Sequence, residues 1–443
     1  MHLRGIEWSG RGLLWLAVAG ACGGAPAGLP STVAIVDSAG ITLVRNMDAS
    51  VDTLAIELVE TFRLGTVDGP EETQFHLING IATDASGRYY VIDQGTQSIR
   101  VYAPDGRFVR RFGGAGRGPG QFTFIGQLFL WRDTVHAADI RDARVSLFDT
   151  AGVHLTSFAN LLPNGSRIRL LQGGSAGWYV ADDSLLSGRS REQVGVSRQT
   201  PTEIKRIEPG LIERVARSRE AADSLLVPVT TYAGMRVFGM LGSEGGSERF
   251  VLGNPPFFEP RPSHAIDARG MVYVAHGWPY VVDVFDANGE LVRRISRAHD
   301  SVQVTDALVA EVLRRARAYY DTTSERRGAS YHTYTERARM PAVGYVPITR
   351  EMKASAEGWL WVRRADLDPE PARLEWSIGE PPRPTYWDVF DPDGTFRMMV
   401  RLPLRFTPHQ VLPDAVIGVQ RDELDVQYVV RYELRQADQV RNR

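Results

Sequence analysis

The chain has 443 residues, of which 43% are hydrophobic and 23% are charged. This composition is typical of a globular protein with enough apolar side chains for a large core. The formal net charge is -2, and the two signs are mixed along the chain, so there is no long basic field to recruit nucleic acid or an anionic membrane. Intrinsic disorder and nucleic-acid binding are therefore excluded as starting hypotheses.

The first 21 residues have the features of an export signal. A mildly cationic start leads into "GLLWLAVAGA", an apolar run far shorter than the ~20 residues that span a bilayer. It ends in "AGAC", which resembles the lipobox of bacterial lipoproteins, where the cysteine is lipidated and becomes the first mature residue. Cys22 is the only cysteine, which suits an anchor better than a disulfide.

We therefore expect a lipoprotein signal peptide at residues 1–21, a lipid on Cys22 and a flexible tether over residues 22–32. The expected location is the bacterial cell envelope, in the periplasm or on the outer membrane. Ala19 stands where the lipobox more often has leucine, so ordinary secretion and an unlipidated cysteine stay open as alternatives.

A 29-residue pattern at residues 84–112 recurs without a gap at residues 267–295. In each copy, a run of aromatic and β-branched residues follows a glycine, and a second run leads into Asp105-Gly106 or Asn288-Gly289. Such pairs supply the positive φ angles of tight hairpins. Each copy therefore predicts three antiparallel strands.

The same pattern returns in weaker form at four further places. These are residues 133–158, "GWYVADD" near Trp178, "GWLWVRRAD" joined through an insertion to "TYWDVFDPDGTFRMMV", and "AVIGVQRDELDVQYVVRYEL". Six repeats of about 45 residues fall in the range of propeller blades. The strand runs are apolar on both alternations, so both faces of each sheet need a cover, which radial stacking provides. We predict an all-β fold, a six-bladed β-propeller of four-stranded antiparallel blades.

The linker "FGGAGRGPGQF" at residues 112–122 resembles the connection between blades in NHL-type six-bladed β-propellers, and "RLGTVDGPEETQF" is a weaker copy. The resemblance covers most of the mature chain. It implies that residues 54–65 form an outer strand that closes the ring by pairing with residues 426–435. The hairpin at residues 33–46 is expected in the same closing blade, so the propeller would occupy residues 33–443.

Two insertions interrupt the repeats. The third repeat is stretched between about residues 184 and 262, where "GLIERVARSREAADSLL" has helical spacing. The segment 305–320 predicts an amphipathic helix with Thr305 as N-cap. This helix would pack at the propeller edge or cap a face or pocket. Its apolar side is formed by Leu308, Val309, Val312, Leu313, Ala316 and Tyr320.

A search for catalytic motifs gives no match. The sequence has no HExxH, no GxSxG and no DxDxDG calcium loop. The histidines are scattered singly, and Cys22 is committed to the anchor. Catalytic residues are therefore unassigned, and neither a metal nor another cofactor is predicted.

The repeat frame places polar side chains at equivalent positions just after the second strand of each blade. In the first three repeats these are Asp93, Asp139 and Asp182. In the last three they are His276, Arg364 and Arg421. Aspartates at such turns commonly accept hydrogen bonds from loop amides. The three basic residues cannot do so when charged, and all six are candidates for a rim that binds a polar or anionic ligand.

A second set of candidates comes from the segments that begin each blade. Because side chains of a strand alternate between its two faces, about half of this set can face a central channel. The candidates are His76, Asn79, Arg261, His264, Arg350 and His409.

Three functions are consistent with these features. The chain is a lipid-anchored module that binds a ligand or protein of the envelope, a propeller hydrolase or lyase of the lactonase kind with a metal or polar site at the channel mouth, or a purely structural envelope component. The hydrolase hypothesis rests on related six-bladed propellers, and a fold does not settle function. We expect a monomer that touches the membrane through its lipid alone and binds no nucleic acid.

Overall fold

The computed structural model describes residues 33–47, 56–131, 133–142, 144–159, 169–174, 177–182, 196–207, 226–244, 247–253, 256–320, 334–335, 337–338, 344–375 and 382–436. Between residues 159 and 255 the description is of strand backbone only. Val33–Arg443 is one compact unit. The expected signal peptide, tether and lipidated Cys22 lie outside the described residues. None of the described helices is long and apolar enough to cross a membrane.

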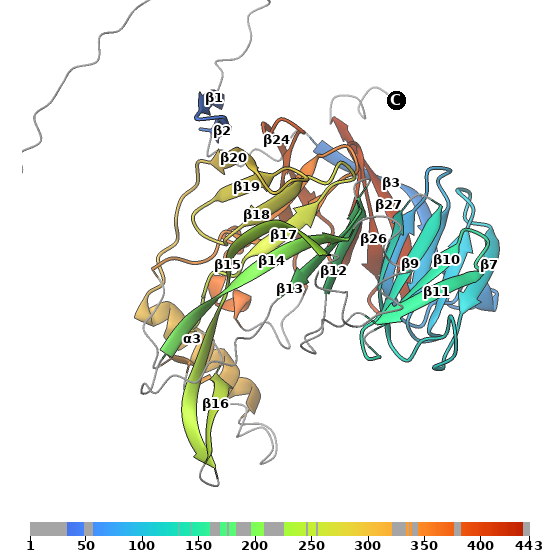
Figure 1. Ribbon diagram of the computed structural model, residues 1–443, viewed down its shortest axis with the longest axis horizontal. Coiled ribbons are helices and arrows are strands. Elements are labelled where there is room, and N and C mark those ends of the chain that lie inside the picture. Colours follow the sequence, from blue (N-terminus) through green and yellow to red (C-terminus); the bar gives the residue numbers. More distant parts are fainter. Residues whose placement is uncertain are drawn as a thin grey trace, which may run out of the picture. The chain divides into compact units, whose positions relative to one another are not determined.

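The described chain is mostly β and contains six sheets (Figure 1). Four sheets each have four antiparallel strands. The first holds β4 (Ile78–Thr83), β5 (Tyr89–Asp93), β6 (Ser98–Tyr102) and β7 (Phe108–Gly113), and the second holds β8 (Ile125–Trp131), β9 (Thr134–Asp139), β10 (Arg144–Asp149) and β11 (His154–Ala159). The third holds β21 (Thr349–Ala354), β22 (Leu360–Arg364), β23 (Thr385–Phe390) and β24 (Phe396–Leu402), and the fourth holds β25 (Phe406–Val411), β26 (Ala415–Arg421), β27 (Gln427–Gln436) and β3 (Ile56–Leu64).

The other two sheets are larger than the four-stranded prediction. One has five strands, β12 (Arg169–Gly174), β13 (Gly177–Asp182), β14 (Val196–Ile207), β15 (Leu226–Glu244) and β16 (Ser247–Gly253). Its long strands take up part of the predicted insertion, and the segment of helical spacing lies outside the described residues. The other has six strands, β1 (Val33–Ser38), β2 (Ile41–Asn46), β20 (Leu291–Arg297), β19 (Val281–Phe285), β18 (Val272–Ala275) and β17 (Ser263–Ile266).

The first strands of successive sheets contact one another in a cycle. β4 contacts β8, β8 contacts β12, and the contacts continue through β17, β21 and β25 back to β4. This cyclic contact of inner strands is the arrangement of a β-propeller. β5 and β6 are buried at every position, as expected for strands covered on both faces.

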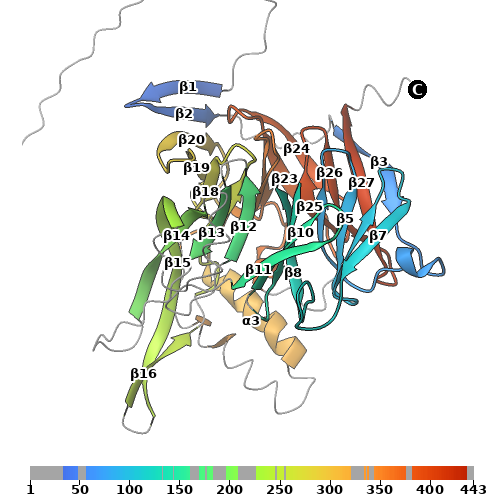
Figure 2. The ribbon, with the colours of Figure 1, turned by 45° about the vertical axis from the view of Figure 1, so that its right-hand side comes forward.

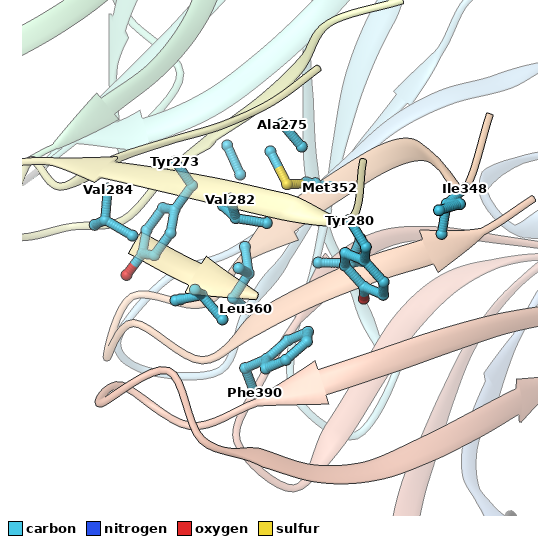
Figure 3. Close-up of a cluster of buried hydrophobic side chains, with 12 residues drawn as sticks. Tyr273, Ala275, Tyr280, Val282, Val284, Ile348, Met352, Leu360 and Phe390 are labelled. Carbon is cyan, nitrogen blue, oxygen red and sulfur yellow. The ribbon is translucent and has the colours of Figure 1, made fainter. Parts of the chain in front are cut away.

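Buried side chains fill the space between neighbouring sheets. Figure 3 shows one such cluster, in which Tyr273 and Val282 of β18 and β19 lie beside Leu360 and Phe390 of the next sheet. Among the described side chains, the sheets β4–β7, β21–β24 and β25–β3 each bury apolar residues against both neighbours, so one such blade would expose these faces if it stood alone.

β3 closes the ring by pairing antiparallel with β27, as the sequence predicts. The prediction that the hairpin at residues 33–46 joins this closing sheet is wrong. β2 instead pairs in parallel with β20 (Figure 2). β3 already occupies the free edge of β27, and the amide of Asn46, which is 3% exposed, donates to the carbonyls of Ser296 and Gly394 and accepts from the backbone of Phe396.

The two duplicated turns have a positive φ at their glycines, with φ of 86° at Gly106 and 85° at Gly289. Neither Asp105 nor Asn288 has one, so the prediction of positive φ across the pair holds for the glycine alone. The Asp105 carboxylate accepts a hydrogen bond from the Arg107 amide, and a register shift lies beside the turn. These are wider hairpin loops with a bulge.

The helix α3 (Asp306–Tyr320) lies where the sequence predicts it. The Thr305 hydroxyl accepts a hydrogen bond from the Leu308 amide at 3.3 Å, which caps the first turn. The buried face, with Val312 and Ala316, packs near the short 3-10 helix η2 (Pro371–Leu374). A second 3-10 helix, η1 (Glu71–Thr73), precedes β4.

Candidate functional site

Asp93 ends β5, and its carboxylate binds the backbone of the segment before β4 and of the turn after β5. Its Oδ1 accepts hydrogen bonds from the backbone amides of His76, Leu77 and Gly95, at 3.1 to 3.3 Å. Its Oδ2 accepts one from the buried Arg100 guanidinium at 2.6 Å. The carboxylate is fully buried, so this contact set is the loop-fastening role that turn chemistry favours for aspartate.

Asp139 does the same at the end of β9. Its carboxylate accepts bonds from the amides of Thr123, Phe124, Arg141 and Asp142. Burial raises the pKa of this carboxyl, but the amide donors outweigh burial, so the pKa lies below its ordinary value. The side chain of Asp182 lies outside the described residues.

Arg364, at the end of β22, is the basic counterpart and sits in a buried ionic cluster. Its guanidinium pairs with Asp366 at 2.7 Å and with Asp388 at 3.1 Å. Asp388 also accepts a hydrogen bond from the Tyr280 hydroxyl at 2.7 Å and pairs with Arg297. Burial lowers the pKa of Arg364, but the two carboxylates outweigh burial and hold it above its ordinary value.

The other two basic rim candidates are His276 and Arg421. His276 is half-buried directly after β18. Arg421 ends β26, keeps 33% of its side chain exposed and pairs with Asp425 at 2.9 Å. A ligand role for the rim residues stays a prediction.

Three channel candidates lie where an inner strand skips a residue in its pairing. Asn79 is skipped in β4, Arg350 in β21 and His409 in β25. Such bulges re-aim a side chain. Asn79 and Arg350 are exposed, whereas burial and the nearby Lys353 lower the pKa of the half-buried His409 to about 3.

The other three channel candidates do not lie at strand bulges. His264 is paired regularly with Val274 and is half-buried. Arg261 is exposed just before β17. His76 is 60% exposed, with its ring 3.6 Å from the Asp93 carboxylate.

Two of the predicted residues, Arg350 and Arg364, come together in a cavity of about 230 Å³. Arg363 and Arg383 also line it, so we call it the arginine cavity. Its walls come from β21, β22, the start of β23 and the segment around η2, and they include the ring of Tyr386. Adjacent arginine guanidinium groups form a site for carboxylate or phosphate oxygens.

The arginines of this cavity are paired unequally. Arg383 lies 2.6 Å from Glu370 and 3.4 Å from Asp368. For Arg363 the ion pair with Glu351 is 3.6 Å long. Arg350 has the longest contact, 3.9 Å to Glu375, and is 35% exposed.

The setting of Arg350 is electropositive. The surrounding protein desolvates its guanidinium and lowers its pKa; Glu375 opposes this, and Arg261, Arg363 and Arg337 lower the pKa further. Glu375 is itself shared, since Arg337 lies 2.6 Å from it. Arg350 therefore has the weakest carboxylate pairing of the four arginines that line this cavity.

Helix α3 supports one wall of the cavity. Glu370 accepts from Arg315 of α3 at 2.6 Å and from Arg383 at 2.6 Å. These two hydrogen bonds lower the pKa of Glu370 to about 2. The helix thus orients Arg383 through a single carboxylate.

Sequence reasoning missed Arg363 and Arg383. Arg383 lies in "PPRP", within the insertion that separates the two halves of the fifth repeat. The insertion starts at the rim position Arg364. This proximity was the one feature of the sequence that could have pointed to Arg383. Among the residues that the structure describes, no group of three or more His, Cys, Asp or Glu is placed to hold a metal ion.

No protein-family model and no curated protein matches this chain. Several solved structures are similar. A DUF4221 family member from Bacteroides vulgatus is 10% identical with a TM-score of 0.45, over 87% of this chain and 99% of that one. Virginiamycin B lyase from Staphylococcus aureus is 10% identical with a TM-score of 0.38, over 85% and 99% of the two chains.

A gluconolactonase from Xanthomonas campestris is 12% identical with a TM-score of 0.35, over 86% of this chain and 91% of that one. At these identities and TM-scores, the likenesses assign neither a reaction nor a ligand. The candidate site rests on the geometry of this chain alone.

Proposed function

We propose that the chain is a six-bladed β-propeller of the bacterial cell envelope, anchored through a lipid on Cys22, that binds a small anionic ligand in the arginine cavity. The cycle of inner-strand contacts and the pairing of β3 with β27 support the six-bladed form, with the larger sheets as blades that carry added strands. The single cysteine at the end of the apolar leader supports the anchor.

The observation that carries the ligand assignment is the state of Arg350. It projects from a bulge of an inner strand, is one-third exposed, and has its nearest carboxylate at 3.9 Å. Arg364 and Arg383 are held by ion pairs of 2.7 and 2.6 Å, so their guanidinium groups are oriented in advance. Preorganised donors cost little to order when a ligand binds.

Calorimetric titration of the full chain in detergent, with glucuronate, galacturonate, gluconate, citrate and phosphate, tests this function. We expect at least one carboxylate ligand to bind, and Arg350→Ala to weaken it at least tenfold. Arg111→Ala is the matched control, because Arg111 is an exposed arginine 3.1 Å from Glu71 on another sheet. An absence of binding by all five anions, or equal losses in both variants, would contradict the assignment.

The anchor has its own test. Cells that express the full chain and a Cys22→Ser variant are labelled with an alkyne fatty acid and fractionated. We expect label and membrane association in the parent chain and neither in the variant. Labelling of the variant, or an unlabelled parent, would contradict the lipoprotein assignment without touching the arginine cavity.

A further inference from the structure

A second cavity, a shallow and open depression of about 440 Å³, shares Arg383 with the arginine cavity. Arg383 lines both, and Pro382 and Pro384 on either side of it line one cavity each. The second cavity is bounded by Arg405, before β25, and by Arg421, at the end of β26. Arg383 therefore lies where the two cavities meet, between neighbouring sheets.

The second cavity also presents cations to solvent. Arg421 is 33% exposed, and its partner Asp425 is 65% exposed, so this ion pair is screened by water and easily exchanged for another anion. Arg405 directs its guanidinium to the backbone carbonyl of Asp422 at 3.2 Å. Asp425 is the one carboxylate that lines this cavity.

The backbone of Arg405 is an outlier. Its φ is 58°, in the left-handed region that favours glycine. A non-glycine residue in this region costs free energy, and such residues cluster at ligand sites. Asp425, which lines the same cavity, also has a left-handed φ, of 66°.

The lining is not purely cationic. Pro382 and Phe406 lie among the arginines of the second cavity, and Pro384, Leu374 and Tyr386 among those of the first. Apolar and aromatic surfaces between charged groups suit a ligand with a carbon skeleton between its acidic groups. Inorganic polyanions offer no such skeleton.

We infer that the two cavities form one groove for a linear oligosaccharide that carries a carboxylate on successive sugar units. One acidic unit lies in the arginine cavity, and a second is bound by Arg405 and Arg421, with Arg383 between them. This inference rests on the proposed function and adds to it the ligand class and a second subsite. Because the second unit binds intramolecularly once the first is seated, affinity should rise with chain length.

The experiment is a calorimetric titration of the full chain with galacturonate, digalacturonate and trigalacturonate. We expect the dimer or trimer to bind at least tenfold tighter than the monomer. Arg405→Gly and Arg421→Gln should each remove most of that gain while leaving monomer affinity within twofold. Arg350→Ala should weaken all three ligands, and Arg111→Gln should weaken none.

Arg405→Gly separates a ligand role from a structural one. Glycine accepts the left-handed φ without strain, so the melting temperature should stay the same or rise while oligosaccharide affinity falls. A lower melting temperature together with unchanged affinity for the trimer would overturn the role of Arg405.

The outcomes also distinguish a failure of the groove from a failure of the proposed function. If monomer and trimer bind equally and Arg405→Gly changes neither, the groove is wrong while the anion site stands. If citrate or phosphate binds and no sugar acid does, the sugar-acid class is wrong while the anion site stands; if none of the five anions binds, the proposed function fails as well. A titration with tripolyphosphate completes the set, because tighter binding of tripolyphosphate than of trigalacturonate would overturn the sugar-acid class.

Discussion

Two sheets of this protein contain the same buried ion pair with its charges exchanged. In the sheet β4–β7, Asp93 ends the second strand and pairs with Arg100, two residues beyond its partner Ser98 on the third strand. In the sheet β21–β24, the same two positions hold Arg364 and Asp388. The strand geometry thus accepts either order of charge.

The order of the two charges determines which further groups the ion pair can bind. An aspartate at the strand end accepts backbone amides and seals the loop, as Asp93 does with three of them. An arginine there has no acceptor to offer. Its partner Asp388 instead receives Tyr280 and Arg297 from the preceding sheet, and Arg364 is left lining a cavity. The reversed pair therefore gives an arginine that lines the cavity for which we propose an anionic ligand, in place of a carboxylate that binds loop amides.

Asp388→Asn should have the largest effect. It removes the Asp388 carboxylate from the buried Arg297 and one of the two carboxylates from Arg364. Breaking a buried pair from one side costs about 3 to 5 kcal/mol of unfolding free energy. Urea unfolding measures this loss, and a value below about 1 kcal/mol would show that the cluster is not a stabilising link between sheets.

Arg100→Met should cost less, about 2 kcal/mol, because Asp93 keeps its three amide donors and methionine keeps the apolar volume. The lost bonds from Arg100 to the carbonyls of Glu71 and Gln74 account for much of the cost. The same urea assay compares the two sheets directly. A loss larger than that of Asp388→Asn would reverse the ranking.

Asp139→Asn tests the sealed loop end by pH. The folded-state pKa of Asp139 is below its ordinary value, so its ionisation stabilises the fold above the unfolded pKa near 3.9, and this stabilisation is lost as the pH falls toward the folded pKa. We expect the variant to be about 1 kcal/mol less stable at pH 7 and to lose less stability than the parent chain between about pH 4 and pH 2. If the unfolding free energies of the two proteins change with pH in parallel, the carboxylate of Asp139 is not stabilised by its amide donors.

Arg421→Gln should have the smallest effect on stability, within about 0.5 kcal/mol, because both partners of its ion pair are exposed. Thermal unfolding checks this value. A cost above about 1.5 kcal/mol would place Arg421 with Arg364 as a structural residue and weaken its use in the groove.

Much of the fold could be predicted because its causes are local. Apolar strands, glycine turns and the Thr305 cap each depend on a few neighbouring residues. The repetition of one pattern predicts that similar sheets stack against one another. Asp93 and Asp139 belong to the same class, since an aspartate after a strand finds its amide donors nearby. The hairpin β1–β2 was misplaced because its pattern fits any free strand edge, and the occupied edge of β27 appears only after closure.

The sequence by itself determined the β-repeat architecture, the closing strand, helix α3 and the polar position at the end of each second strand. Tertiary structure alone decided that Arg350, Arg364 and Arg383 share a cavity and that Asp388 also pairs with Arg297 of the neighbouring sheet. The physical reason is that hydrophobic periodicity acts along one strand. Ion pairs join different strands, and Arg297 with Asp388 joins different sheets, so periodicity along one strand does not reveal the partner.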